Sequence, residues 1–158
     1  MFWRSFQKPA EAGAALQAIG TSGPAGYRDL AQLRRAAEIA NHDAPAGVAA
    51  YDSLVGNPAL LPQLQSVARL RAALLRADEA DMKEMSARLA PLAVPGQGLR
   101  HTARELLALA ALKADDLDAA GKWLDQIVAD PQSPEATRRR AGELQGLVQG
   151  GKPAAAPK

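Results

Sequence analysis

The sequence predicts an all-α protein built from antiparallel helix pairs, and three observations lead to this prediction. Alanine and leucine dominate the 158 residues while aromatic residues make up only 4%, a balance that favours helices over strands. Apolar side chains recur at three- and four-residue spacing between clusters of turn-forming residues. The long predicted helices begin at Pro24, Pro62, Gly98 and Pro134, at intervals of 38, 36 and 36 residues. A period of this length predicts stacked helix pairs, each with one long and one short member.

The first half of the chain predicts four helices. Pro9–Ile19 is a short helix that ends at Gly20, and Pro24–Ala40 is a longer one that ends at an Asn-His-Asp break. Pro45–Val55 is again short, and Pro62–Ala77 has an apolar face so wide that we expect neighbours on both sides. In the second helix, the apolar positions expected on one face are Tyr27, Leu30, Ala31, Leu33, Ala37 and Ala40.

The second half predicts four more helices. Asp81–Leu92 has apolar residues at the spacing of a helix seam and ends before a Pro-Gly pair, and Leu99–Ala114 has a narrow polar edge. Leu117–Ala129 follows two aspartates, and Pro134–Gln149 follows a serine. Such side chains satisfy the free N–H groups of a first helical turn. The expected capping residues are therefore Asp115, Asp116 and Ser133.

We expect one helical repeat domain over residues 9–149. Residues 150–158 are predicted to be a disordered Pro/Ala tail. The last long helix lacks a short partner, as a terminal cap would, and Arg138–Arg140 give it a polar outer face. Three aromatic residues at the N-terminus would promote self-association if they were exposed; they are Phe2, Trp3 and Phe6.

Composition excludes several functional classes. The net charge is only +2 and the charges are interspersed, so we expect no nucleic-acid partner. The absence of cysteine excludes disulfides, thiolate catalysis and Cys-ligated zinc. No run approaches the ~18 apolar residues of a membrane helix, and no signal-peptide core is present, so we expect the chain as given to be soluble.

No catalytic motif is found. His42 and His101 lie 59 positions apart without carboxylates at ligand spacing, and we expect both to be solvated. The sequence contains no phosphate-binding loop, dinucleotide fingerprint or nucleophile elbow. We therefore predict a protein that is not an enzyme and has no metal or cofactor.

The segment KADDLDAAGKWLDQIVADP, from Lys113 to Pro131, is similar to the tetratricopeptide consensus. The consensus positions that it and the preceding helix match are Leu107, Ala108, Ala120, Leu124 and Pro131. Tyr51 and Leu89 occupy the position of Leu124, a wedge between the two helices, in other units, while Asp115 replaces the consensus turn glycine. The resemblance implies a right-handed α-solenoid. It also places Trp123 beside the wedge, where we expect burial against the following helix.

Over about Gln7–Leu147 the chain resembles one family more closely. Runs such as GPAGYRDLAQLRRAAEIA and ARLAPLAVPGQGLRHTARELLALAAL are similar to the tetratricopeptide-like domain of bacterial ancillary Sec-translocon subunits, in its divergent alphaproteobacterial form. Such proteins have one membrane helix and a periplasmic repeat domain implicated in handling exported proteins. The resemblance implies a location at the periplasmic side of the inner membrane and a membrane helix upstream. It also implies that residues 1–8 are the remnant of a first repeat helix. Translocon components or exported proteins would be the partners.

If the pairs stack as tetratricopeptides do, the polar stripes of the long helices would face a partner protein or peptide. The candidate residues are Arg28, Gln32, Arg35, Gln65, Arg69, Arg76, His101, Arg104 and Glu105. A basic groove would hold acidic side chains or a peptide carboxylate through bidentate arginine contacts. Alternatively, these arginines only solvate exposed helix faces and pair locally with Glu38, Asp78 or Glu105.

The function predicted from these patterns is a non-enzymatic protein-protein interaction module. A homo-oligomeric structural scaffold, with the apolar N-terminal end as the contact, is an alternative. A cytosolic tetratricopeptide adaptor is another, because the envelope location depends on the resemblance alone.

Overall fold

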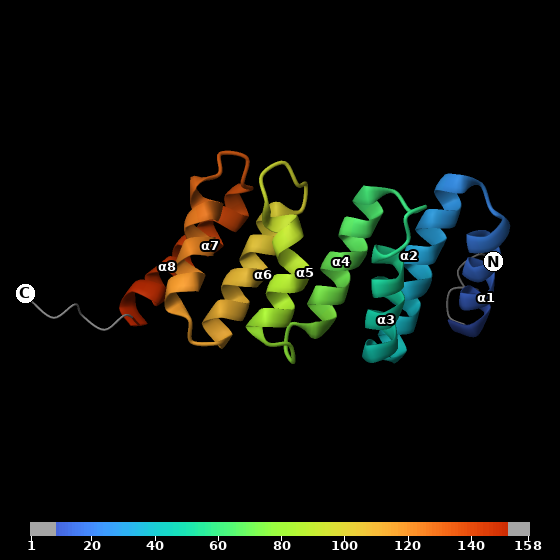
Figure 1. Cartoon of the computed structure of the whole chain (residues 1–158), viewed down its shortest axis with the longest axis horizontal. Coiled ribbons are helices and arrows are strands. Elements are labelled where there is room, and N and C mark those ends of the chain that lie inside the picture. The colour runs from blue at the N-terminus through green and yellow to red at the C-terminus, as the bar shows by residue number, and fades with distance from the viewer. Residues whose placement is uncertain (1–8, 152–158) are drawn as a thin grey trace, which may run out of the picture. The chain divides into compact units, whose positions relative to one another are not determined.

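The computed structural model describes residues 9–151, which form eight α-helices and no strand (Figure 1). The helices are α1 Pro9–Ser22, α2 Ala25–His42, α3 Ala44–Val55, α4 Pro62–Arg76, α5 Met82–Ala93, α6 Arg100–Lys113, α7 Leu117–Ala129 and α8 Glu135–Gly151. Each predicted helix is present, and the all-α prediction is confirmed. Predictions for Phe2, Trp3, Phe6 and the tail from residue 152 lie outside the described residues.

An aspartate begins each of the short helices α3, α5 and α7. The carboxylate of Asp43 accepts a hydrogen bond from Ala46 N at 2.9 Å, and Asp81 and Asp116 accept equivalent bonds at 2.8 and 2.9 Å. Asp43 also ends α2, because its own N–H donates to Ile39 O. Each carboxylate satisfies an N–H that the helix leaves free and lies at the positive end of the helix dipole. The prediction that Asp116 caps α7 is confirmed.

The other predicted cap, Asp115, has a different role. Its φ of 57° is the one positive value at a non-glycine position among residues 9–151. Asp116 N donates to Ala111 O and Asp115 N donates to Leu112 O, the pair of bonds that closes a helix with a left-handed residue. Asp115 therefore adopts the glycine-like conformation at the position where the tetratricopeptide consensus has glycine.

The helices form two compact units that meet in the sequence between Arg76 and Ala77. In the N-terminal unit α2 packs on α1 and α3, α3 packs on α4, and α2 also contacts α4. Its core combines small and large side chains: Leu33, Ala36, Tyr51, Leu54, Leu60, Ala68 and Ala72. Alanines on α2 and α4 let the helices approach closely, and Tyr51 fills the remaining space.

In the C-terminal unit α6 packs on α5 and α7, and α8 packs on α7 and contacts α6. One core cluster there comprises Ala108, Ala111, Ala120, Leu124, Ile127, Ala141 and Val148. Trp123 is partly buried against this cluster, which includes two residues of α8, in agreement with its predicted burial. A single domain over residues 9–149 stays a prediction.

Three local predictions are wrong. Tyr27 and Leu30 are 68% and 56% exposed, because they share a stripe of α2 with the exposed Arg34 rather than with Leu33. In an alanine-rich helix two adjacent stripes have similar periodicity, so the sequence does not separate them. Ser133 does not cap α8: Pro134 precedes the first helical residue, and Ser133 Oγ is buried without a hydrogen-bond partner in the described part of the chain. Finally, two helices end later than predicted: α1 continues past Gly20 to Ser22, and α8 continues past Gln149 to Gly151.

Candidate functional site

The predicted partner-binding residues divide between the two units. His101, Arg104 and Glu105 lie on α6 in the C-terminal unit, and the other six lie on α2 and α4 in the N-terminal unit. The two sets differ in burial and in hydrogen bonding.

Arg104 links several helices inside the C-terminal unit and is only 4% exposed. Its Nε donates to Ala93 O at 2.9 Å and its Nη1 donates to Gln126 O at 3.2 Å. Both carbonyls belong to the last turns of helices, α5 and α7, where backbone oxygens lack helical partners and carry partial negative charge. One guanidinium thus joins the C-terminal ends of two helices to the first turns of α6.

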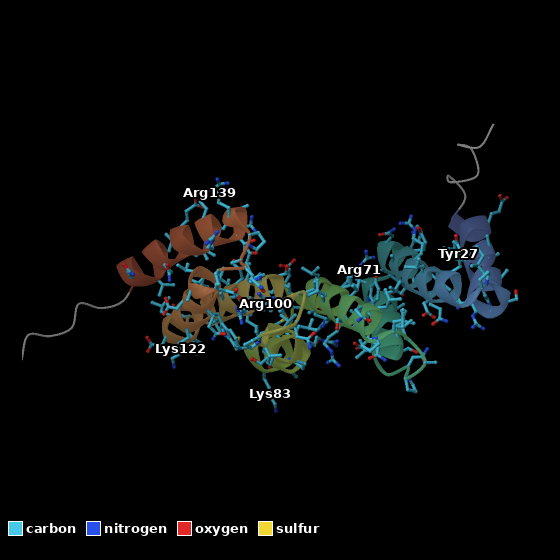
Figure 2. The ribbon with its side chains drawn as sticks, turned by 90° about the horizontal axis from the view of Figure 1, so that it is seen from above. Tyr27, Arg71, Lys83, Arg100, Lys122 and Arg139 are labelled. Carbon is cyan, nitrogen blue, oxygen red and sulfur yellow. The ribbon has the colours of Figure 1, made fainter. Side chains whose placement is uncertain are left out.

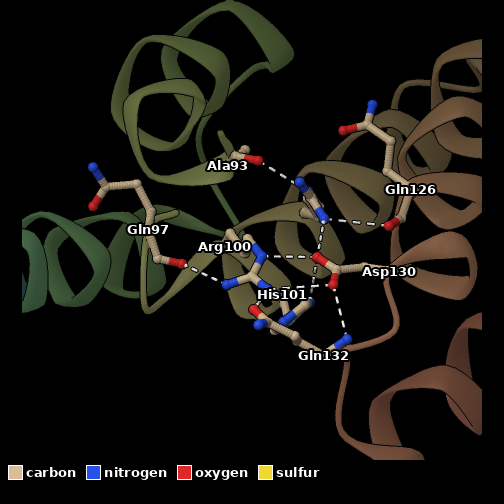
Figure 3. A network of polar contacts seen from close by, with 8 residues as sticks. Ala93, Gln97, Arg100, His101, Gln126, Asp130 and Gln132 are labelled. Atoms are coloured by element: carbon tan, nitrogen blue, oxygen red, sulfur yellow. Dashed lines mark hydrogen bonds and ion pairs between the residues drawn. The ribbon is translucent and has the colours of Figure 1, made fainter. Parts of the chain in front are cut away.

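Asp130, the residue after α7, is the centre of the same network (Figure 3). Arg100 donates to its two carboxylate oxygens, from Nε at 2.7 Å and from Nη2 at 3.3 Å, and Arg104 Nη1 donates at 3.1 Å. The N–H of Gln132 donates to Oδ1 at 3.0 Å, and the Gln132 side chain accepts from Arg100 at 2.6 Å. The pKa of Asp130 lies well below its usual range, mainly because Arg100 donates a hydrogen bond to its carboxylate. The same bond raises the pKa of Arg100.

His101 lies beside this carboxylate without a hydrogen bond to it. Its Nδ1 is 3.8 Å from Asp130 Oδ2 and has no hydrogen-bond partner among the described residues. Burial lowers the pKa of His101, and the positive charge of Arg100 lowers it further. The prediction that His101 is solvated is therefore wrong, because the residue is 9% exposed, whereas His42 is exposed as expected.

The prediction that His101 and Arg104 face a partner is corrected by this geometry. The guanidinium of Arg104 is bound in a network that joins α5, α6 and α7, and His101 is buried beside that network. Neither side chain is exposed to a partner. The sequence holds one indication that was missed: Asp130 follows the C-terminal end of α7, where a negative charge is unfavourable unless a cation neutralises it. The arginines four residues apart at the start of α6 supply that charge.

Other polar side chains of the C-terminal unit also join its helices. Lys113 Nζ donates to the carbonyls of Ala77, Asp78 and Ala80, in the turn before α5. Arg140 makes a bidentate contact with Glu105, at 2.7 and 3.0 Å, which raises the pKa of Arg140. On the expected outer face of α8, Arg140 thus contacts another helix, whereas Arg138 and Arg139 are exposed. Arg139 is labelled in Figure 2.

In the N-terminal unit a cavity of about 450 Å³ lies over α2, bordered by α1 and α3; we call it the short-helix cavity. Its lining residues are Leu16, Gln17, Gly20, Thr21, Gln32, Arg35, Ala36, Ile39, Ala50, Ser53 and Leu54. Two predicted residues, Gln32 and Arg35, are brought together here. Arg35 also lines an adjoining space of about 390 Å³ between α1 and α2, together with Gln17 and Ile39.

A smaller cavity of about 310 Å³ lies between α2 and α4; we call it the long-helix cavity. It is lined by Ala37, Ala40, Asn41, Tyr51, Arg71, Leu74 and Leu75. Arg71 Nη1 donates to Tyr51 Oη at 3.3 Å, so this arginine already has a partner. Arg71 was not among the predicted residues, although its position on α4 is visible in Figure 2.

The remaining predicted residues line neither cavity. Arg28 is exposed near the start of α2, while Arg69 and Arg76 are half-buried on α4. Gln65 donates from Nε2 to Asn57 O at 2.6 Å and so stabilises the loop before α4. At the period of an α-helix, Gln32 and Arg35 lie roughly 140° around α2 from the residues that face α4. The expected stripe on α2 therefore faces α1 and α3, not α4.

Among residues 9–151, no group of three or more His, Asp or Glu side chains is placed to hold a metal ion. None of the helices in that range is both long and apolar enough to cross a membrane. Comparison with known protein families, with curated proteins and with solved structures finds no match to the chain.

Proposed function

We propose that the chain is a non-enzymatic protein-interaction module that holds a partner segment in its N-terminal unit. The observation that carries this proposal is that Arg35 borders a cavity and is unpaired among the described residues. It lines the short-helix cavity, and among the described residues it has neither an ion-pair nor a hydrogen-bond partner. Its neighbour Arg34 is paired with Glu38 at 2.7 Å. An arginine that is positioned over a cavity and left unpaired is suited to bind a group from another molecule.

We further propose a tetratricopeptide-like right-handed solenoid of antiparallel pairs, because the short helices repeat in register. Counted from Asp43, Asp81 and Asp116, the residues four, eight and eleven positions later are buried in each case. These residues are Gly47, Tyr51 and Leu54, then Met85, Leu89 and Leu92, then Ala120, Leu124 and Ile127. One cap and one buried stripe thus recur three times, which is typical of repeat proteins.

Close approach of helices supports the same proposal. A Cβ built on Gly47 would overlap Ala40, so α3 lies against α2 at a distance that only glycine allows. Ala120 is the small residue at the equivalent position of α7 and is fully buried, whereas α5 has Met85 there. Small residues at this position of the second helix are a feature of the tetratricopeptide consensus that the sequence resembles.

For the cellular setting, we propose that the chain is part of a membrane-anchored protein. It would act beside the protein-export machinery at the periplasmic side of the inner membrane. This step is supported only by the sequence resemblance over about Gln7–Leu147. The partners would be translocon components or exported proteins. A cytosolic adaptor or a homo-oligomeric scaffold would be the alternative.

Site-specific photo-crosslinking in cells tests the proposal. The crosslinker replaces Ser53, an exposed residue that lines the short-helix cavity, and in a matched control it replaces Lys122, exposed on α7 (Figure 2). We expect adducts with other proteins at position 53 and not at position 122. Envelope or exported proteins in those adducts would support the export setting, and purely cytosolic ones would contradict it. Equal capture at both positions, or none at position 53, would overturn the interaction site.

The homo-oligomer alternative has its own test. Light scattering over a range of concentrations measures the mass of the chain and of a variant with Trp3 and Phe6 replaced by serine. We expect a mass that does not depend on concentration for either. A mass that rises with concentration and returns to the monomer value in the variant would favour the scaffold instead.

A further inference from the structure

The short-helix cavity has two chemically distinct parts. Leu16, Ile39 and Leu54 supply aliphatic surface from α1, α2 and α3 in turn. The polar groups come from Arg35, Gln17, Gln32, Thr21 and Ser53. The hydroxyl of Thr21 already donates to carbonyls of its own helix, Gln17 O at 3.1 Å and Ala18 O at 3.0 Å. The groups left to bind a ligand are chiefly the guanidinium and the two side-chain amides.

The charge of the residues around the cavity determines the sign of the charge on a ligand that would bind there. Among the described residues, Arg35 is the one ionisable residue that lines the short-helix cavity. Glu38 and His42 line the adjoining space, but Glu38 is held by Arg34 at 2.7 Å, and its pairing leaves Arg35 without a counter-ion among the described residues. A planar guanidinium with free donors matches a carboxylate, which accepts two parallel hydrogen bonds.

Size limits what can enter. One turn of an α-helix with its side chains is 10–12 Å across and 5.4 Å long, or roughly 500 Å³. The short-helix cavity, at about 450 Å³, is comparable in volume to one such turn or a few extended residues. Its volume lies within the usual range of small-ligand sites, about 300–1,000 Å³. A folded partner would thus enter with only a short segment.

We propose that the short-helix cavity binds a peptide segment that presents a carboxylate next to an aliphatic side chain. Arg35 holds the carboxylate, Gln17 and Gln32 donate hydrogen bonds beside it, and the aliphatic group packs on Leu16, Ile39 and Leu54. The proposal rests on the proposed interaction function and adds the chemistry and the location of the ligand. It places recognition on the face of α2 between α1 and α3, away from the long-helix cavity.

The carboxylate has two possible sources, and the probes separate them. One fluorescent peptide ends in Leu-Leu with a free carboxylate, and a second is the same peptide with an amidated end. A third is amidated and carries an internal Leu-Glu-Leu. Fluorescence polarisation with the full chain measures binding of each. We expect binding of the first or the third, or of both, and at least tenfold weaker binding of the second.

Matched variants locate the site. Arg35→Ala should weaken binding of the carboxylate peptide by roughly tenfold to a hundredfold, as expected for loss of hydrogen bonds to a charged group. Arg28→Ala, which removes an exposed arginine of α2 that lines neither cavity, should leave it unchanged. Ser53→Trp should abolish it by filling the cavity. Because Arg35 is exposed and unpaired, helical content and thermal midpoint should not change in Arg35→Ala, and circular dichroism checks this.

Some outcomes would overturn the inference. Equal binding of the amidated and the free peptide would exclude carboxylate recognition, and equal loss in Arg28→Ala and Arg35→Ala would exclude this site. If no probe binds while position 53 still captures partners in cells, the carboxylate inference is wrong and the interaction function stands. If position 53 captures nothing as well, both are wrong.

Discussion

Arg35 in the N-terminal unit and Arg104 in the C-terminal unit share a residue type but not a role. Both lie on long helices, and both were expected to face a partner. Arg104 is 4% exposed, and three of its hydrogen bonds reach α5, the end of α7 and Asp130. Arg35 is exposed and has no such bond among the described residues. The environment, more than the residue type, separates a structural arginine from one that we propose binds a partner.

The difference follows from what surrounds each guanidinium. Arg104 has the C-terminal carbonyls of two helices and a carboxylate within reach. Its guanidinium therefore keeps its hydrogen bonds although it is buried. Arg35 borders a cavity whose other walls are aliphatic side chains and neutral polar groups. Nothing in the described N-terminal unit neutralises it, and a ligand can.

The largest effect is expected from removing Arg104. In Arg104→Ala the Asp130 carboxylate and the two carbonyls lose a donor in a buried place, and we expect a loss of about 3 kcal/mol in unfolding free energy. Denaturant unfolding followed by Trp123 fluorescence, in a Trp3→Phe background, reports on the C-terminal unit. Arg35→Ala is the control and should change unfolding by less than about 0.5 kcal/mol. Similar losses in both variants would remove the distinction between the two arginines.

The pH dependence of unfolding comes next. The pKa of Asp130 is lowered in the folded state, so its stabilisation is present above the unfolded value, 3.8, and is lost as pH falls below that value. The pKa of His101 is also lowered, so stability should already fall as pH drops below 6.5, where the unfolded chain takes up the proton first.

Single substitutions separate the two groups. His101→Gln should flatten the stability profile just below pH 6.5, and Asp130→Asn should flatten it below pH 4, measured by urea unfolding at each pH. Asp130→Asn should also be less stable at neutral pH, because the amide cannot replace the charge between two guanidinium groups. A profile unchanged in both variants would contradict the assigned network.

Much of the fold could be predicted from the sequence, and the reasons are local. Proline and glycine positions, together with the aspartates before α5 and α7, place helix boundaries within a few residues, because capping is a short-range interaction. Burial was harder to predict. Tyr27 and Leu30 satisfied the spacing rule but lie on the wrong stripe, since an alanine-rich helix leaves its core face poorly marked.

The candidate site was predicted only in part. Gln32 and Arg35 do line one cavity, but α1 and α3 form its sides, and that packing is not encoded within α2. His101 and Arg104 were misplaced because their partner, Asp130, is 26 to 29 residues further along the chain. Contacts over such distances depend on tertiary structure that periodicity does not show.

The capping aspartates allow the two units to be compared directly. Asp43→Ala removes the cap of α3 in the N-terminal unit, and Asp116→Ala removes that of α7 in the C-terminal unit. Each should cost about 1 kcal/mol, since each deletes one side-chain bond to a free N–H. Hydrogen exchange should show faster exchange at Ala46 and Ala119 respectively, each in its own variant only. Loss of protection throughout both units in either variant would argue against independent caps.

The smallest expected effect is a gain in stability. Asp115 has a φ of 57°, which glycine adopts without steric cost, so Asp115→Gly should stabilise the C-terminal unit by a few tenths of a kcal/mol to about 1 kcal/mol. The flexibility of glycine in the unfolded chain offsets part of the gain. The thermal midpoint measures the effect, with Asp115→Ala as the destabilised control. A lower midpoint for glycine than for aspartate would show that the aspartate side chain stabilises the turn.

Hydrogen exchange of the arginine Nε protons, followed by NMR, tests the central comparison most directly. In the free chain the protons of Arg100 and Arg104 should exchange slowly, because they are bound to Asp130 at 2.7 Å and to Ala93 O at 2.9 Å. The proton of Arg35 should exchange at the rate of solvated arginine and slow down when a carboxylate peptide that binds, the free Leu-Leu or the internal Leu-Glu-Leu peptide, is added. Slow exchange at Arg35 without peptide, or fast exchange at Arg104, would contradict the division between a binding and a structural arginine.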